Sequence, residues 1–136
     1  MAEGAFRAAA AKAGLTVETD SCGTAAYHVG EPPDGRAIAT AAKHGVDISD
    51  LRGRQLTASD FSRFTHIFAM DHENLSNIQR VAPPDASAHV GLLLDLVLGR
   101  SGQPVSDPYY GDEAEFQTTW KDVSVAAGAL VAKLSR

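Results

Sequence analysis

The sequence predicts an α/β fold in which helices flank a parallel sheet. Helical spacing of apolar residues alternates with short β-branched or apolar stretches. The stretch at residues 90–94 is almost continuously apolar, as a strand covered on both faces would be. Strands alternating with helices in this way form parallel sheets with right-handed crossovers. With 136 residues, 44% apolar and 21% charged, we expect a single domain over residues 1–136.

Each expected helix has a start or stop signal. The first, at residues 1–13, ends where Gly14 can adopt a left-handed conformation. The last keeps the 3.6-residue period from Phe116 to Leu134 and begins at Asp112, an N-cap residue type. Three shorter helices are expected after Asp34, after the capping-box sequence at 57–60, and after Asp71.

Strands are expected at residues 17–21, 66–70 and 90–94. The first is short and half β-branched, and the turn signal Gly23 follows it. The second lies between two helix signals, and the third follows the helix that Pro83 and Pro84 end. Together they predict a parallel sheet.

Composition and charge exclude several functions. Twelve basic residues are scattered among seventeen acidic ones, for a net charge of −5, which argues against a nucleic-acid partner. The longest apolar stretch is too short to span a bilayer, so no membrane partner is expected. The single cysteine, Cys22, cannot form an internal disulfide, and the histidines have no metal-ligand spacing. We expect a cytoplasmic protein without a metal or other cofactor.

Six short motifs, in order along the chain, together resemble the low-molecular-weight protein-tyrosine phosphatases. Single pieces such as Ala-Met-Asp have little specificity, but the ordered set does. The motifs are Met-Ala-Glu-Gly-Ala-Phe-Arg at 1–7, Ser-Cys-Gly-Thr at 21–24, His-Val-Gly-Glu-Pro-Pro-Asp at 28–34, Arg-Gln-Leu-Thr at 54–57, Ala-Met-Asp with Asn-Leu at 69–75, and Asp-Pro-Tyr-Tyr-Gly at 107–111. The resemblance implies a three-layer phosphotyrosine phosphatase I-like fold and an enzyme that hydrolyses phosphomonoesters through a phosphocysteine.

By this resemblance, Asp107 is the general acid that protonates the departing tyrosyl oxygen. A phenol of pKa about 10 leaves more easily as the neutral alcohol. Pro108 fixes its own φ and biases Asp107 toward an extended backbone, which would aim the carboxyl group. Taken alone, Asp-Pro is typical of the start of a turn.

The resemblance also implies a binding site for the substrate ring. Tyr109 and Tyr110 would form one wall, and Tyr27 would face them across the mouth. Large rings with a polar tip suit this use. The alternative for each is an aromatic residue half-buried at a surface, and for Tyr27 the two interpretations are equally favoured. Ser21 matches a serine that supports the phosphate-binding loop, at one remove from the substrate. The implied partner is a phosphotyrosine protein or a small aryl phosphate; the sequence does not indicate an oligomeric state.

One part of the family pattern is missing. The nucleophilic cysteine, the five loop residues after it and the phosphate-binding arginine precede the position that Met1 occupies, as does the central first strand of the sheet. Cys22 does not replace this motif, because His28 stands six positions later, where arginine is needed. Cys22 is expected to be a small, partly buried side chain.

Two hypotheses follow. In the first, residues 1–136 are an N-terminally truncated phosphatase whose true start lies upstream of Met1, and the chain as given is inactive. In the second, the chain is a non-catalytic relative that binds a partner through Tyr27, Tyr109 and Tyr110. A stable, cooperatively folded product would favour the second, and an aggregated or molten product the first. A decayed gene product without function is a third possibility.

Overall fold

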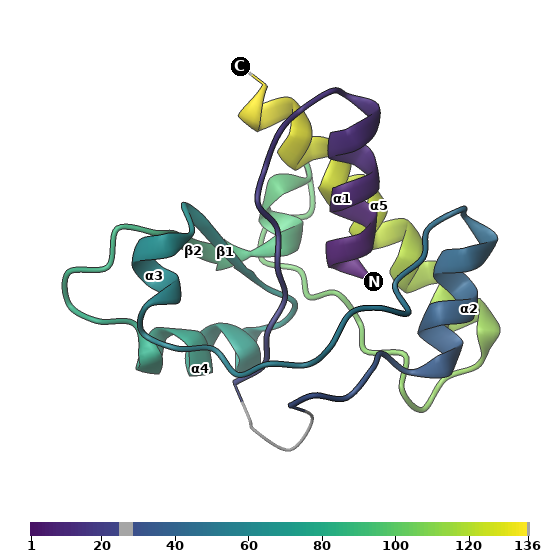
Figure 1. Ribbon diagram of the computed structural model, residues 1–136, viewed down its shortest axis with the longest axis horizontal. Helices are drawn as coiled ribbons and strands as arrows, with labels where there is room; N and C mark the ends of the chain where they lie inside the picture. The colour runs from purple at the N-terminus through teal and green to yellow at the C-terminus, as the bar shows by residue number, and fades with distance from the viewer. Residues whose placement is uncertain (25–28, 136) are drawn as a thin grey trace.

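The computed structural model describes residues 1–24 and 29–135 of the chain (Figure 1). The elements in chain order are α1 Ala2–Lys12, α2 Gly35–Lys43, α3 Asp60–Arg63, β1 His66–Ala69, α4 His72–Val81, β2 His89–Leu92, the 3₁₀ helix η1 Leu93–Leu96, and α5 Glu113–Leu134. Helices and strands alternate from α3 to η1, whereas the described part of the chain before β1 passes through α1, α2 and α3 in succession.

The predicted parallel pairing is confirmed for two strands. β1 and β2 are parallel and pair from His66 opposite His89 to Ala69 opposite Leu92. α4 makes the crossover between them, as the predicted strand, helix and strand unit requires. Two isolated parallel bridges, Gly23 with Gln55 and residue 29 with residue 53, run alongside in the loops.

The strand expected at residues 90–94 is shorter at its end than predicted. β2 stops at Leu92, and a 3₁₀ turn follows, because the Asp95 carboxylate accepts the Leu92 amide at 3.3 Å. This turn carries Leu93 and Leu94 into the core, where both are buried. The apolar character of residues 93 and 94 therefore reflects burial in the 3₁₀ turn and not in a strand.

The prediction of a strand at residues 17–21 is wrong. The stretch is an extended path beside α1 (Figure 1), and its side chains alternate between partly buried and exposed, but it forms no strand within the described residues. Extended backbone becomes a strand only when a neighbouring strand pairs with it. Side chains meet this stretch instead: Arg7 donates to Thr19, and Arg54 donates to Asp20 at 2.8 Å.

The predicted helix starts are confirmed by hydrogen bonds. Three aspartates accept an amide of the first turn: Asp34 from Arg36 at 2.8 Å, Asp71 from Asn74 at 2.7 Å, and Asp112 from Glu115 at 3.2 Å. At the start of α3, Asp60 accepts the Thr57 amide at 2.9 Å, which is half of the expected capping box. Gly14 has φ +70° and ends the first helix as expected.

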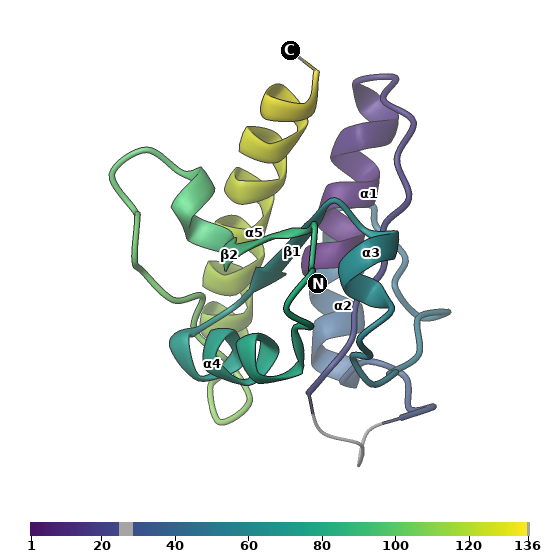
Figure 2. The same ribbon diagram turned by 90° about the vertical axis from the view of Figure 1, so that its left-hand side faces the viewer.

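Two hydrophobic clusters fill the interior. The first joins α1, α2, α5 and η1, and α1 and α5 lie side by side in both views (Figures 1 and 2). The second joins β1, β2, α3 and α4. Adjacent residues of β1 serve different clusters: Phe68 packs against the first and Ala69 belongs to the second. Because successive residues of a strand face opposite sides, the sheet separates the clusters and helices flank it.

The described residues include no helix with both the length and the apolar character needed to cross a membrane.

Candidate active site

The segment before Asp107 is anchored to the carboxyl end of β1. The Val105 amide donates to the Met70 carbonyl at 2.7 Å, and the Thr119 hydroxyl of α5 donates to the Ser106 carbonyl at 3.0 Å. Val105 is buried in the first cluster. Ligand sites of parallel α/β sheets lie beyond the carboxyl ends of the strands. Asp107 follows directly on this anchored backbone.

Asp107 begins a tight turn with its side chain exposed to solvent. Its carboxylate accepts the Tyr109 amide at 3.0 Å, and the Gly111 amide donates to the Pro108 carbonyl at 2.8 Å. Pro108 itself is buried. The turn expected of Asp-Pro is therefore present, and it leaves the carboxylate open to a ligand.

Tyr109 and Tyr110 form an exposed aromatic pair beside this turn. The centres of their rings are 4.9 Å apart, and the ring planes are nearly perpendicular, at 86°. Tyr109 is 58% exposed to solvent and Tyr110 is 97% exposed. An edge-to-face pair of this kind is a favourable aromatic geometry. Two large rings at the surface next to a carboxylate could flank an aromatic ligand. Tyr27, expected to face them, lies outside the described residues.

Ser21 contacts the N-terminal end of α1. Its hydroxyl donates to the Glu3 carboxylate, which also pairs with Arg7 and is buried. The Ser21 amide binds the preceding aspartate side chain at 2.9 Å. Ser21 thus supports the first turn of α1, where unpaired backbone amides favour an anion.

Cys22 lacks the electrostatic setting of a nucleophile. The expectation of a partly buried side chain is wrong: Cys22 is exposed, on an extended stretch that no strand of the described residues covers, and it forms no disulfide. Desolvation of the thiol raises its pKa; Arg54 opposes this effect, while Asp60 and Asp20 add to it. A reactive cysteine needs a lowered pKa. This agrees with the expectation that Cys22 does not replace the nucleophile.

Arg36, which the sequence analysis did not single out, reaches the Asp107 turn from α2. Its guanidinium donates to the Tyr109 carbonyl at 2.9 Å and lies 4.8 Å from the centre of the Phe116 ring. In the sequence, Asp34-Gly35-Arg36 indicates the start of a helix. It does not indicate that Arg36 contacts a residue 73 positions later in the chain.

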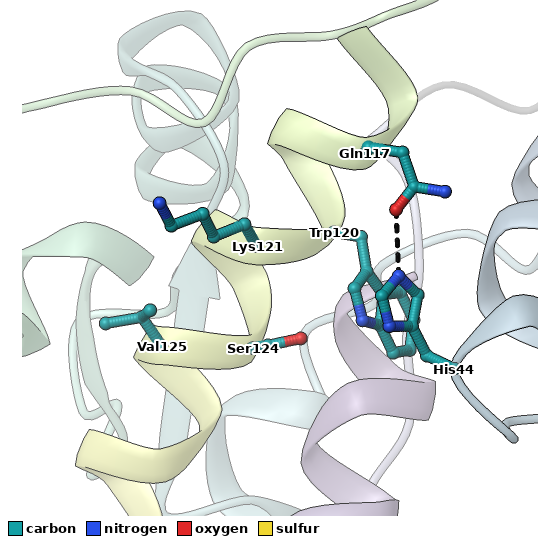
Figure 3. Close-up of a pocket in the computed structure, with 6 residues that line it drawn as sticks. All are labelled: His44, Gln117, Trp120, Lys121, Ser124 and Val125. Carbon is teal, nitrogen blue, oxygen red and sulfur yellow. Dashed lines mark hydrogen bonds between the residues drawn. The ribbon is translucent and has the colours of Figure 1, made fainter. Parts of the chain in front are cut away.

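A hollow of about 590 Å³ lies elsewhere, on the face of α5 next to the end of α2 (Figure 3). There the His44 ring stacks on Trp120 at 5.1 Å, and its Nε2 is 2.8 Å from the Gln117 side-chain oxygen. None of the described candidate residues lines it. Within the ranges 1–24 and 29–135, no group of three or more His, Cys, Asp or Glu side chains could hold a metal ion.

The protein is thus an α/β protein whose Asp-Pro-Tyr-Tyr-Gly turn, one of the motifs that resemble the phosphatases, lies at the carboxyl end of a parallel strand. The whole chain, residues 1–136, matches the family described as low molecular weight phosphotyrosine protein phosphatase. The protein belongs to this family.

Relatives and solved structures agree with this assignment. The chain is 44% identical to a low molecular weight phosphotyrosine protein phosphatase of Schizosaccharomyces pombe, over 85% of this chain and 76% of that one. It is 39% identical to phosphatase 1 of this type from Drosophila melanogaster, over 85% and 74%. A protein tyrosine phosphatase structure from Entamoeba histolytica superposes with a TM-score of 0.91 at 28% identity, covering 98% of this chain and 86% of that one. The relatives are thus named as hydrolases.

Proposed function

We propose that the protein hydrolyses aryl phosphomonoesters, such as phosphotyrosine in a protein or a small aryl phosphate, with Asp107 as general acid. The observation that carries the proposal is the exposed Asp107 carboxylate on a turn anchored to β1, in a chain of a phosphatase family. Tyr109 and Tyr110 are proposed to flank the substrate ring, together with Tyr27. Ser21 is proposed to support the phosphate-binding loop through the start of α1.

The proposed reaction has two steps. A cysteine thiolate attacks phosphorus and the P–O bond to the phenol breaks, while Asp107 gives its proton to the departing oxygen. Water then attacks the phosphocysteine, Asp107 takes a proton from that water, and phosphate leaves as the thiolate is restored. The attacking cysteine and a phosphate-binding arginine must come from a Cys-x5-Arg segment, which these 136 residues do not contain. We therefore propose that the 136 residues alone are inactive.

The test compares the 136-residue chain with the same chain joined at Met1 to a family-type segment, an apolar strand followed by Cys, five residues and Arg. We expect the joined protein to hydrolyse phenyl phosphate and 4-nitrophenyl phosphate, and the chain alone to show no enzymatic rate. Turnover by the chain alone at a normal enzymatic rate would refute the need for the segment.

In the joined protein, Asp107→Asn tests the acid. Because 4-nitrophenol leaves without protonation more readily than phenol, we expect kcat/KM to fall about 10²-fold or more for phenyl phosphate and much less for 4-nitrophenyl phosphate. Asp85→Asn, at an exposed aspartate, is the matched control. Equal losses on both substrates would contradict the acid role.

A second candidate function is non-catalytic binding through the tyrosine pair. The observation in its favour is that Tyr110 is almost fully exposed, at 97%, on a chain without Cys-x5-Arg. It predicts that the 136-residue chain captures a phosphotyrosine peptide and that Tyr110→Ala weakens this capture. Absence of measurable binding by the folded chain would eliminate this candidate.

A further inference from the structure

Arg36 connects the start of α2 to the turn that carries Asp107. Its Nη2 donates to the Tyr109 carbonyl at 2.9 Å, and its Nη1 lies 3.4 Å from the Gly111 carbonyl. The guanidinium carbon is 4.8 Å from the centre of the buried Phe116 ring in the first turn of α5, and 5.7 Å from that of Tyr109. One side chain therefore contacts the turn and both helices beside it.

Asp34 fixes the direction of this side chain. Its carboxylate accepts from Arg36 Nε at 3.1 Å and from Nη2 at 3.0 Å, while it also caps α2 through the Arg36 amide. The side-chain hydrogen bond from Arg36, with help from the backbone bond, lowers the pKa of Asp34, and the same pairing raises the pKa of Arg36. Both groups are charged at neutral pH, so the fork keeps a fixed orientation.

The backbone hydrogen bonds of the turn are local. The Tyr109 amide donates to the Asp107 side chain and the Gly111 amide donates to the Pro108 carbonyl, so both hydrogen bonds stay within the turn. Among the residues that the structure describes, Arg36 is the side chain from outside the turn that donates to its carbonyls. The anchors at Val105 and Ser106 come before Asp107, and the cap of α5 at Asp112 comes after Gly111. Between these two ends, Arg36 supplies the side-chain hydrogen bonds to the carbonyls of the turn.

We propose that Arg36 is a positioning residue, which holds the turn at residues 107–111 against α2 and α5 and so fixes where the Asp107 carboxylate lies. The contact with the turn stands on the geometry above, and its consequence for catalysis rests on the proposed function. Displacement of a catalytic group by about 1 Å can cost about 10²-fold in rate, so a small loosening of an exposed turn is enough to matter.

The first test uses the 136-residue chain labelled for NMR. The Tyr109 amide, which donates to Asp107, and the Gly111 amide, which donates to Pro108, report on the turn. In Arg36→Gln we expect the chemical shifts of both amides to move toward those of an unstructured chain, and their exchange to rise about tenfold relative to α5 amides. Arg36→Lys should behave like Arg36→Gln, because an ammonium lacks the fork. Arg80→Gln on α4 is the matched control and should leave both readouts unchanged.

The second test uses the joined protein and the two aryl phosphates. Arg36→Gln should lower kcat/KM for phenyl phosphate by about tenfold and for 4-nitrophenyl phosphate by less than about threefold. The effect should lie in kcat more than in KM, since Arg36 does not touch the proposed substrate. Asp34→Asn keeps a capping side chain but removes the paired charge. Its kcat/KM for phenyl phosphate should lie between that of Arg36→Gln and that of the unchanged protein.

The outcomes separate this proposal from the proposed function. Unchanged Tyr109 and Gly111 signals in Arg36→Gln would overturn it. The second test compares kcat/KM for phenyl phosphate with kcat/KM for 4-nitrophenyl phosphate. If Asp107→Asn alters this ratio, but Arg36→Gln changes the turn and leaves the ratio unchanged, the proposal is also overturned. The acid role of Asp107 would then stand without Arg36. If Asp107→Asn does not alter the ratio, the acid role is wrong, and the NMR result alone decides whether Arg36 holds the turn.

Discussion

At the residue scale, Asp60 is a buried charge with a complete set of partners. It is 4% exposed, accepts two hydrogen bonds from the Arg54 guanidinium at 2.9 and 3.0 Å, and accepts the Thr57 amide at 2.9 Å. Arg54 also binds Asp20 at 2.8 Å. This arrangement joins Asp20 to the segment at residues 54–60, close to the bridge between Gly23 and Gln55.

Replacing Asp60 with Asn should therefore destabilise the fold. The amide retains one acceptor for the Thr57 amide, but it leaves the Arg54 charge only half paired. Loss of one partner of a buried ion pair costs about 3 kcal/mol or more. We expect a loss of about 2–3 kcal/mol in the free energy of unfolding by urea titration, because Arg54 remains partly exposed. Asp85→Asn is the control, and a loss no larger than that of the control would contradict this account.

The same residue predicts a pH dependence. Burial raises the pKa of Asp60, but the hydrogen bonds from Arg54 and Thr57 outweigh this, so its folded-state pKa is lowered. A lowered folded-state pKa stabilises the fold above the unfolded-state value of about 3.9 and loses that stabilisation as the pH falls through the folded-state value. The stability difference between the unchanged protein and Asp60→Asn should be constant near neutral pH and shrink below about pH 4. A difference that grew on acidification would have the wrong sign.

At the scale of elements, glycine position decides how α1 packs. A Cβ at Gly4 would lie 2.5 Å from Ile48 Cγ2 and 3.1 Å from Val46 Cγ1, and Ile48 is 1% exposed. The helix therefore approaches the segment after α2 as closely as a glycine allows. Gly128, in the exposed part of α5, has no atom within 4 Å of such a Cβ.

The two glycines should respond oppositely to alanine. Gly4→Ala overpacks a filled site and should lower the free energy of unfolding by about 1–2 kcal/mol, net of the better helix propensity of alanine. Gly128→Ala gains only the better helix propensity of alanine, and it should raise the free energy of unfolding by about 0.5–1 kcal/mol. Thermal unfolding of both variants measures this directly. Stabilisation by Gly4→Ala would show that Ile48 moves aside at no cost.

At the scale of the whole molecule, the two clusters share the thin sheet between them. Leu94 is fully buried in the first cluster, and Ile78 is buried in the second. Trp120, the single tryptophan, lies in the first. Because the strands contribute alternate residues to both sides, the two clusters are expected to unfold together in the joined protein, as domains of this size usually do.

This expectation is testable through Trp120 fluorescence. Leu94→Ala and Ile78→Ala should each lower the midpoint of the same tryptophan-detected transition, with losses of about 2–5 kcal/mol. Circular dichroism should give the same midpoint. A normal tryptophan transition in Ile78→Ala, with an earlier loss of ellipticity, would show that the clusters unfold independently.

The sequence alone determined the helices, the parallel strand pair and the family. Local chemistry suffices for the helices: the Asp34, Asp71 and Asp112 caps act within three residues, and the period of α5 repeats over 22 residues. The family rests instead on the resemblance of the six ordered motifs. The Asp-Pro turn was also readable, since Asp107 bonds an amide two residues on. The roles of Asp107, Tyr109, Tyr110 and Ser21 in the site stay predictions.

Only the tertiary structure decided which extended or apolar stretches became strands and what holds the candidate site. Residues 17–21 are extended but form no ladder among the described residues, because pairing needs a neighbour that local pattern cannot supply. Residues 93 and 94 entered the core through a 3₁₀ turn set by the Asp95 side chain. The Arg36 contact with the turn spans 73 residues, and a contact over that distance depends on how α2 and α5 pack and not on any local preference.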